Sequence, residues 1–88
     1  MGENGFQAFV EAIIRVVVER LDPSLDPSVI SAETALVGTG LAFDSMAMLD
    51  LVTGLEDELG IMIDESKLDQ DVFETVGALA RFLEEHAE

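Results

Sequence analysis

One stretch constrains the fold more than any other. It runs from Leu41 to Gly60 and reads LAFDSMAMLDLVTGLEDELG. Asp44 and Ser45 are short polar residues of the kind that caps a helix N-terminus, and Gly60 follows the last apolar position, where glycine commonly ends a helix. We therefore expect a helix over residues 44–59 that begins at Asp44 or Ser45, with Ser45 at the positive end of the helix dipole.

This expected helix is amphipathic at 100° per residue. Its apolar face holds Met48, Leu51, Val52, Leu55 and Leu59, with Leu49 at the border. Its opposite face holds Met46, Asp50, Thr53 and Asp57. The pattern therefore directs Met46, the neighbour of Ser45, toward solvent between two carboxylates.

Helical patterns also occupy both ends of the chain. Apolar residues recur at helical spacing over residues 4–21, with Asn4 as a candidate cap, and again from Thr75 onward. Between the first two helices lies a long connection, residues 22–43, whose apolar side chains we expect to pack on the core: Val29, Ile30, Leu36, Val37 and Leu41. A helical turn is possible at residues 31–34, Ile61, Met62 and Ile63 should pack, and a short helix is expected near residues 65–73. The prediction is an all-α bundle of three main helices plus a short helix, forming one domain over residues 1–88 with a core over about 6–83.

Charge restricts the partners. The chain has 19 acidic and 4 basic residues and a formal net charge of -15, which argues against nucleic acid or an anionic membrane and favours a partner with a basic patch. With 49% hydrophobic residues the chain is too apolar to be a disordered acidic tail. The sequence contains no run long enough to span a bilayer and no signal peptide pattern. We expect a cytoplasmic, free-standing monomer.

Few residues are suited to catalysis. The chain has no cysteine, and His86, its only histidine, lies near the charged C-terminus, far in sequence from Ser45. No metal-binding loop or phosphate-binding glycine loop is present. We therefore expect no catalytic residue, no metal site and no enzyme activity, and Asp44-Ser45 remains as the feature to explain.

The whole layout resembles the acyl carrier protein family. The features that carry this resemblance are a small acidic helical domain, a long first loop, Asp44-Ser45-Met46 at the start of the second long helix, and Leu-Glu-Asp-Glu-Leu-Gly-Ile at its end. The resemblance covers residues from about Phe6 to Leu83 and is strongest over residues 41–63.

The resemblance implies a prosthetic group. In that family the serine of Asp-Ser-Leu receives 4′-phosphopantetheine from coenzyme A through a phosphopantetheinyl transferase that uses magnesium, and Ser45 matches this serine. Asp44 matches the preceding aspartate, as a helix cap and a recognition element for the transferase. The arm ends in a thiol that holds cargo as a thioester, so the carrier presents intermediates to a loading enzyme and to downstream synthases or transferases without performing bond chemistry.

The resemblance also implies a docking face on the second helix. Met46 matches an apolar contact residue, Asp50 and Asp57 match acidic docking positions, and Glu56 flanks them. Ala47 stands where fatty-acid carriers commonly have an acid, and Thr53 stands where a second apolar contact is often found. Asp64 stands where proline is frequent, in a segment before Val76 that looks longer than in fatty-acid carriers. These departures favour a specialised pathway, polyketide or aminoacyl/peptidyl.

Other interpretations stay open at this point. The chain could be a housekeeping fatty-acid carrier, an acidic helical interaction module in which Ser45 is a plain cap, or an enzyme whose own nucleophile is Ser45. The sequence does not define the cargo. Met48, Leu49, Met62 and Phe73 could line a cargo pocket or be ordinary core residues.

Overall fold

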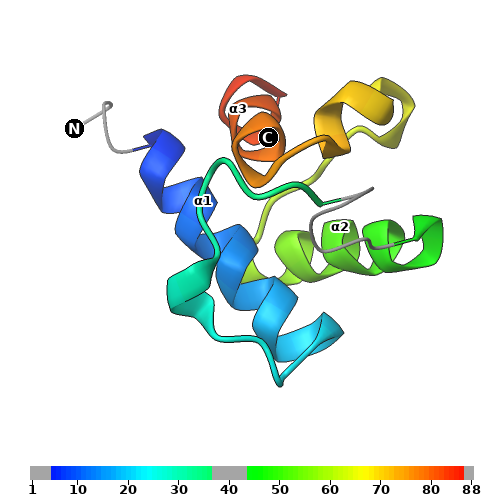
Figure 1. The fold of residues 1–88 in the computed structure, drawn as a ribbon. Coiled ribbons are helices and arrows are strands. Elements are labelled where there is room, and N and C mark those ends of the chain that lie inside the picture. Colours follow the sequence, from blue (N-terminus) through cyan, green and yellow to red (C-terminus); the bar gives the residue numbers. More distant parts are fainter. Residues whose placement is uncertain (1–4, 37–43, 87–88) are drawn as a thin grey trace.

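Three α-helices form the frame of the fold in the computed structural model, which describes residues 5–36 and 44–86 (Figure 1). They are α1 over Gly5–Val16, α2 over Ser45–Leu59 and α3 over Val76–His86. Residues 5–36 and 44–86 contain no β-strand, only an isolated bridge between Ala35 and Thr75. The expected all-α class is confirmed, while the expectations for Asn4, Val37 and Leu41 fall outside the described residues.

The first helix changes its winding before it ends. α1 continues into η2, a wider π-type turn over Val17–Leu21, and the Asp22 N–H donates to the Val17 carbonyl at 2.9 Å. The single helix expected to Leu21 is therefore a regular helix followed by a wide last turn. This change falls in a β-branched run, residues 16–18, where helix propensity is low.

The connection after the first helix packs on the core, and two of its described residues are buried. It contains the 3-10 turn η3 over Pro27–Val29 and a turn in which the Thr34 N–H donates to the Ser31 carbonyl at 3.1 Å. Ile30 is buried as expected, and so is Leu36. Val29 was expected to pack but is 70% exposed, because the 3-10 turn directs it away from the core.

Backbone hydrogen bonds attach this connection to the start of α3. The Val76 N–H donates to the Thr34 carbonyl at 2.9 Å, and the Gly77 N–H donates to the Ala32 carbonyl at 2.7 Å. Thr75 Oγ1 accepts the Ala78 N–H at 3.0 Å and so caps α3. The first connection and the last helix therefore hold each other in place.

The segment between α2 and α3 is mostly irregular. Gly60 ends α2 in the left-handed region at φ 65°, as its position after the last apolar residue predicts. Of the next three residues, Ile61 and Ile63 pack, whereas Met62 is 73% exposed because alternate residues of an extended segment point to opposite sides. In place of one short helix over residues 65–73, the structure has two 3-10 turns, η4 over Glu65–Lys67 and η5 over Gln70–Phe73.

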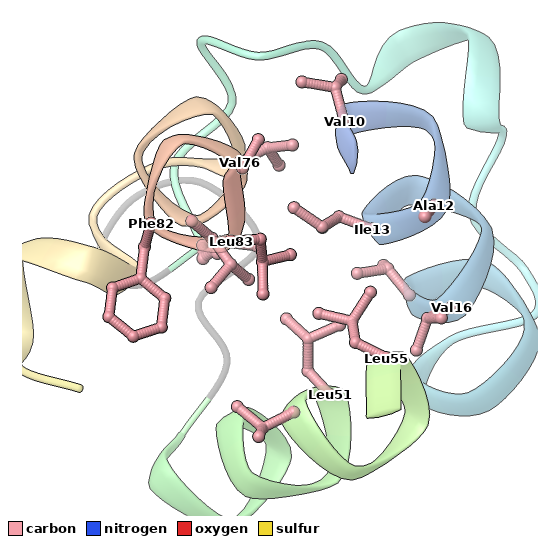
Figure 2. Close-up of a cluster of buried hydrophobic side chains, with 14 of the residues drawn as sticks. Val10, Ala12, Ile13, Val16, Leu51, Leu55, Val76, Phe82 and Leu83 are labelled. Carbon is pink, nitrogen blue, oxygen red and sulfur yellow. The ribbon is translucent and has the colours of Figure 1, made fainter. Parts of the chain in front are cut away.

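The core lies between the three α-helices. Figure 2 shows side chains from each of them meeting, including Ile13 and Val16 of α1, Leu51 and Leu55 of α2, and Leu83 of α3. The apolar face expected for residues 44–59 is confirmed, with Leu51, Val52 and Leu55 fully buried, Met48 nearly so and Leu59 half-buried. Among the described residues, none of the helices is long and apolar enough to cross a membrane.

Candidate functional site

The start of α2 is defined by the cap at Asp44. This residue is extended, with φ -87° and ψ -178°, and its Oδ1 accepts the Ala47 N–H at 2.9 Å. Its carbonyl oxygen accepts the Met48 N–H at 3.0 Å, the first hydrogen bond of the helix. Asp44 is therefore the N-cap and Ser45 is the first helical residue, while the Ser45 side chain lies outside the described part of the structure.

This position favours negative charge. A helix of 15 residues begins at Ser45, and its aligned peptide dipoles place partial positive charge at that end. The start of a helix also presents backbone N–H groups along its axis, which suits phosphate oxygens. The main chain at Ser45 therefore fits an attached phosphodiester.

The outer face of α2 contains exposed apolar and acidic side chains together. Met46 is 79% exposed, and Thr53, Asp50 and Asp57 are also exposed, as the helical pattern predicts. Leu49, expected at the border, is 56% exposed and joins this face. The sequence alone could have placed Leu49 among the docking residues, because it follows Met46 by three residues, and residues three apart lie only about 60° apart around a helix.

Two residues expected at the docking surface are placed differently. Ala47 is half-buried and packs against the core. Glu56 is also half-buried, and its Oε2 accepts the Ile63 N–H at 2.9 Å. The exposed outer face, as the structure presents it, consists of Met46, Leu49, Asp50, Thr53 and Asp57.

A basic residue from the end of the first helix reaches this outer face. Arg20 Nη2 lies 3.0 Å from Asp57 Oδ2, and Arg20 Nη1 lies 4.0 Å from Asp50 Oδ1. Arg20 was not predicted at this surface, because the ion pair joins residues far apart in the chain. Composition was the signal that could have indicated such an ion pair, because the chain has 4 basic and 19 acidic residues and each basic side chain therefore has many possible acidic partners.

Gly54 allows the two helices to approach closely at this point. It lies between Asp50 and Asp57 along α2, and it is buried. A Cβ atom built on Gly54 would lie 2.7 Å from Arg20 Cδ and 2.7 Å from Val16 Cγ1. The absent side chain therefore leaves room for the stem of Arg20 to cross α2.

Other chemistry is weakly represented in the described residues. His86 lies at the end of α3, with its ring 4.9 Å from that of Phe82 and its Nε2 3.9 Å from Glu85 Oε1. Within residues 5–36 and 44–86, no three side chains of the metal-binding types gather into a site. Of the residues considered for a cargo pocket, Leu49 and Met62 are exposed, Met48 is buried and Phe73 packs against the core.

Comparisons with known proteins agree on one family. A model described as "Phosphopantetheine attachment site" matches residues 10–83. The acyl carrier protein AsbD of Bacillus anthracis is 29% identical over 79 residues, which cover 90% of this chain and 85% of AsbD. The solution structure of the holo acyl carrier protein NE2163 of Nitrosomonas europaea superposes with a TM-score of 0.75 at 29% identity, covering 86% of this chain and 92% of that one.

Proposed function

The chain belongs to the acyl carrier protein family, and we propose that it holds a biosynthetic intermediate as a thioester on 4′-phosphopantetheine attached to Ser45. Members of this family are carriers without catalytic activity of their own, and phosphopantetheine is their prosthetic group. Family membership also implies interaction with a phosphopantetheinyl transferase and with biosynthetic enzymes.

The observation that carries this assignment is the cap at the start of α2. Asp44 accepts the Ala47 N–H and thereby makes Ser45 the first residue of a long helix inside the matched region. A phosphodiester at an exposed helix N-terminus is stabilised by roughly 0.3–1 kcal/mol. The other four serines of the chain lie in loops and short turns: Ser24, Ser28, Ser31 and Ser66.

The chain's own residues need to do little in the attachment reaction. The Ser45 hydroxyl forms an ester bond to the phosphorus of coenzyme A that bears the pantetheine arm, and adenosine 3′,5′-diphosphate leaves. The transferase supplies the base that takes the hydroxyl proton, which agrees with the distance in sequence between Ser45 and His86. The arm brings a thiol, the reactive group that a chain without cysteine lacks.

The outer face of α2 is the proposed docking surface for partner enzymes. Exposed apolar side chains, Met46 and Leu49, would contact an apolar hollow on the partner, and Asp50 and Asp57 would face basic side chains. The absence of an acidic residue at Ala47 and the polar Thr53 favour a dedicated carrier of a specialised pathway, polyketide or aminoacyl/peptidyl.

The assignment is tested by intact-mass spectrometry after incubation with coenzyme A, magnesium and a broad-specificity phosphopantetheinyl transferase. We expect the mass of one phosphopantetheine to be added to the wild type and to Ser24→Ala, and none to Ser45→Ala. A wild type that stays unmodified while another carrier is converted in the same tube would exclude the proposal. The acidic helical interaction module without a prosthetic group would then be the remaining interpretation. Transfer to Ser45→Ala would place the attachment elsewhere.

A further inference from the structure

We infer that Arg20 is a specificity-determining residue of the docking surface. It moderates the charge of Asp50 and Asp57, so the carrier favours partners that recognise Met46 and Leu49 through an apolar hollow over partners that rely on several basic side chains. The inference rests on the proposed function, because it concerns the surface that a transferase or synthase would contact.

The geometry sets one cation against two carboxylates. Asp50 and Asp57 are seven residues apart, two helical turns, and therefore lie on the same side of α2. Arg20 forms a hydrogen-bonded ion pair with Asp57 at 3.0 Å, while its other terminal nitrogen lies 4.0 Å from Asp50. A partner approaching the outer face thus meets two carboxylates and one guanidinium, with a net charge of -1 in place of -2.

The position of Arg20 is determined by packing as well as by charge. The side chain of Arg20 passes over α2 at Gly54. A Cβ atom on Gly54 would lie only 2.7 Å from Arg20 Cδ and 2.7 Å from Val16 Cγ1 of α1. The aliphatic stem is therefore held against the helix between the two aspartates. This packing keeps the guanidinium at the docking surface even though each exposed ion pair is weak on its own.

The consequence for binding follows from competition. A lysine or arginine on a partner must share the two carboxylates with Arg20 or displace it, so each basic side chain on the partner gains less attraction than it would from unpaired aspartates. The apolar contacts are unaffected, because Met46 and Leu49 remain 79% and 56% exposed. Recognition therefore shifts from charge toward apolar contact.

A second ion pair provides a matched control. Arg15 Nε lies 2.6 Å from Glu58 Oε2, also between the first helix and α2. Glu58 lies about 80° around the helix from Asp50 and about 120–140° from Met46 and Thr53, and it pairs with Arg15 of α1, so it does not belong to the outer face. Replacing Arg15 removes the same charge and the same kind of contact without uncovering Asp50 or Asp57.

The test uses a broad-specificity phosphopantetheinyl transferase that has a basic carrier-binding patch. With coenzyme A saturating, the KM for the carrier protein is measured. The carriers compared are wild type, Arg20→Gln, Arg15→Gln, Asp57→Asn and the double variant Arg20→Gln with Asp57→Asn. We expect Arg20→Gln to lower KM by about two- to fivefold at low salt, the effect of one nearby charge in water, and to steepen its rise with salt. Arg15→Gln should change KM by less than half as much. In the Arg20→Gln background, Asp57→Asn should raise KM more than it does in the wild type. Thermal unfolding of each variant checks that the fold is retained.

The outcomes separate the two proposals. A wild type that is not modified refutes the proposed function and this inference with it. A modified wild type with equal KM values for Arg20→Gln and Arg15→Gln refutes only the role of Arg20. An effect of Asp57→Asn that is the same with and without Arg20 also refutes it, because the two residues would then act independently.

Discussion

The Glu56 carboxylate accepts a hydrogen bond from the Ile63 N–H at 2.9 Å, which attaches the last turn of α2 to the segment beyond Gly60. The Glu56 carbonyl accepts two more, from the Gly60 N–H at 2.9 Å and the Ile61 N–H at 3.2 Å. One residue therefore accepts three of the backbone N–H groups of the turn that leaves the helix. The buried position of Ile63 depends on this turn.

Replacing Glu56 should therefore affect stability first. We expect Glu56→Ala to lower the free energy of unfolding by about 1–3 kcal/mol, the cost of removing a charged partner from a part-buried N–H. Glu56→Gln should lose less, because its amide oxygen can still accept. Urea unfolding provides the measurement, with Glu58→Ala as control at about 1 kcal/mol or less for an exposed pair. Equal losses for Glu56→Ala and Glu58→Ala would show that the bond to Ile63 does not stabilise the fold.

Gly54→Ala should destabilise the protein in spite of better helix propensity. Alanine is favoured over glycine inside a helix by about 1 kcal/mol, but overpacking a close contact costs about 1–3 kcal/mol. The new Cβ would lie 2.7 Å from Val16 Cγ1, and Val16 is buried and cannot swing away as Arg20 can. We expect a net loss of about 1 kcal/mol by urea unfolding. Thr53→Ala, at the exposed neighbouring position, should be neutral or slightly stabilising, and a stabilised Gly54→Ala would contradict this account.

Local signals predicted most of the fold, and long-range pairings account for what they missed. The caps at Asp44 and Gly60 and the apolar face of α2 follow from spacing and residue type within one helix, and the structure confirms them. The roles of Glu56 and Arg20 depend on partners that only the tertiary structure brings near, Ile63 and Asp57. No helical periodicity contains that information.

Apolar residues in irregular segments show the same limit. Val29 and Met62 were expected to pack because they are apolar, yet both are exposed. Neither residue belongs to one of the three long helices, so helical periodicity did not place it, and its burial depends on the local direction of the turn η3 or of the segment after Gly60. At the candidate site, spacing alone was enough to predict Met46, Asp50, Thr53 and Asp57 on one exposed face.

Asp44 offers a way to separate capping from recognition by the transferase. Asn caps a helix about as well as Asp, so Asp44→Asn should change stability little, whereas Asp44→Ala should lose about 1 kcal/mol. If the carboxylate helps the transferase to place its metal, Asp44→Asn should slow modification by about tenfold or more. Thermal unfolding and the initial rate of phosphopantetheine transfer test the two effects. An Asp44→Asn protein that is modified at the wild-type rate would limit Asp44 to capping.

Truncation of the exposed apolar side chains should affect docking without affecting the fold. Met46→Ala and Leu49→Ala remove side chains that are largely in solvent, so unfolding free energies should change by about 0.5 kcal/mol or less. Burying such a side chain in a partner contributes up to about 1.5–3 kcal/mol, so the KM of the transferase should rise several-fold. Val29→Ala is the control, because Val29 is 70% exposed but lies in η3. Equal KM values for all three variants would exclude an apolar contact on α2.

A repeated Asp-x-Ser turn should be visible in acid titrations. Asp26 Oδ1 accepts from Ser28, and Asp64 Oδ1 accepts from Ser66, in each case from both the backbone N–H and the hydroxyl. These bonds stabilise the ionised carboxylates and lower the pKa of both groups below 3.8. The larger cause at Asp64 is the hydroxyl of Ser66, whereas at Asp26 it is the backbone N–H of Ser28.

Ser66→Ala should therefore raise the pKa of Asp64 by removing the largest cause of its lowering, whereas Ser28→Ala should leave the largest cause at Asp26, the backbone N–H, in place. A folded-state pKa below the unfolded value gives stability that is complete above the unfolded pKa and is lost as pH falls through the folded one. Each variant should therefore be less stable than the wild type above about pH 4, near the reference pKa of aspartate, and this difference should shrink as pH falls through the folded-state pKa. Carboxyl chemical shifts followed by NMR from pH 2 to 6 measure both groups in one sample, and each variant serves as the control for the other turn. An Asp64 pKa that is unchanged in Ser66→Ala would show that the hydroxyl does not stabilise the carboxylate.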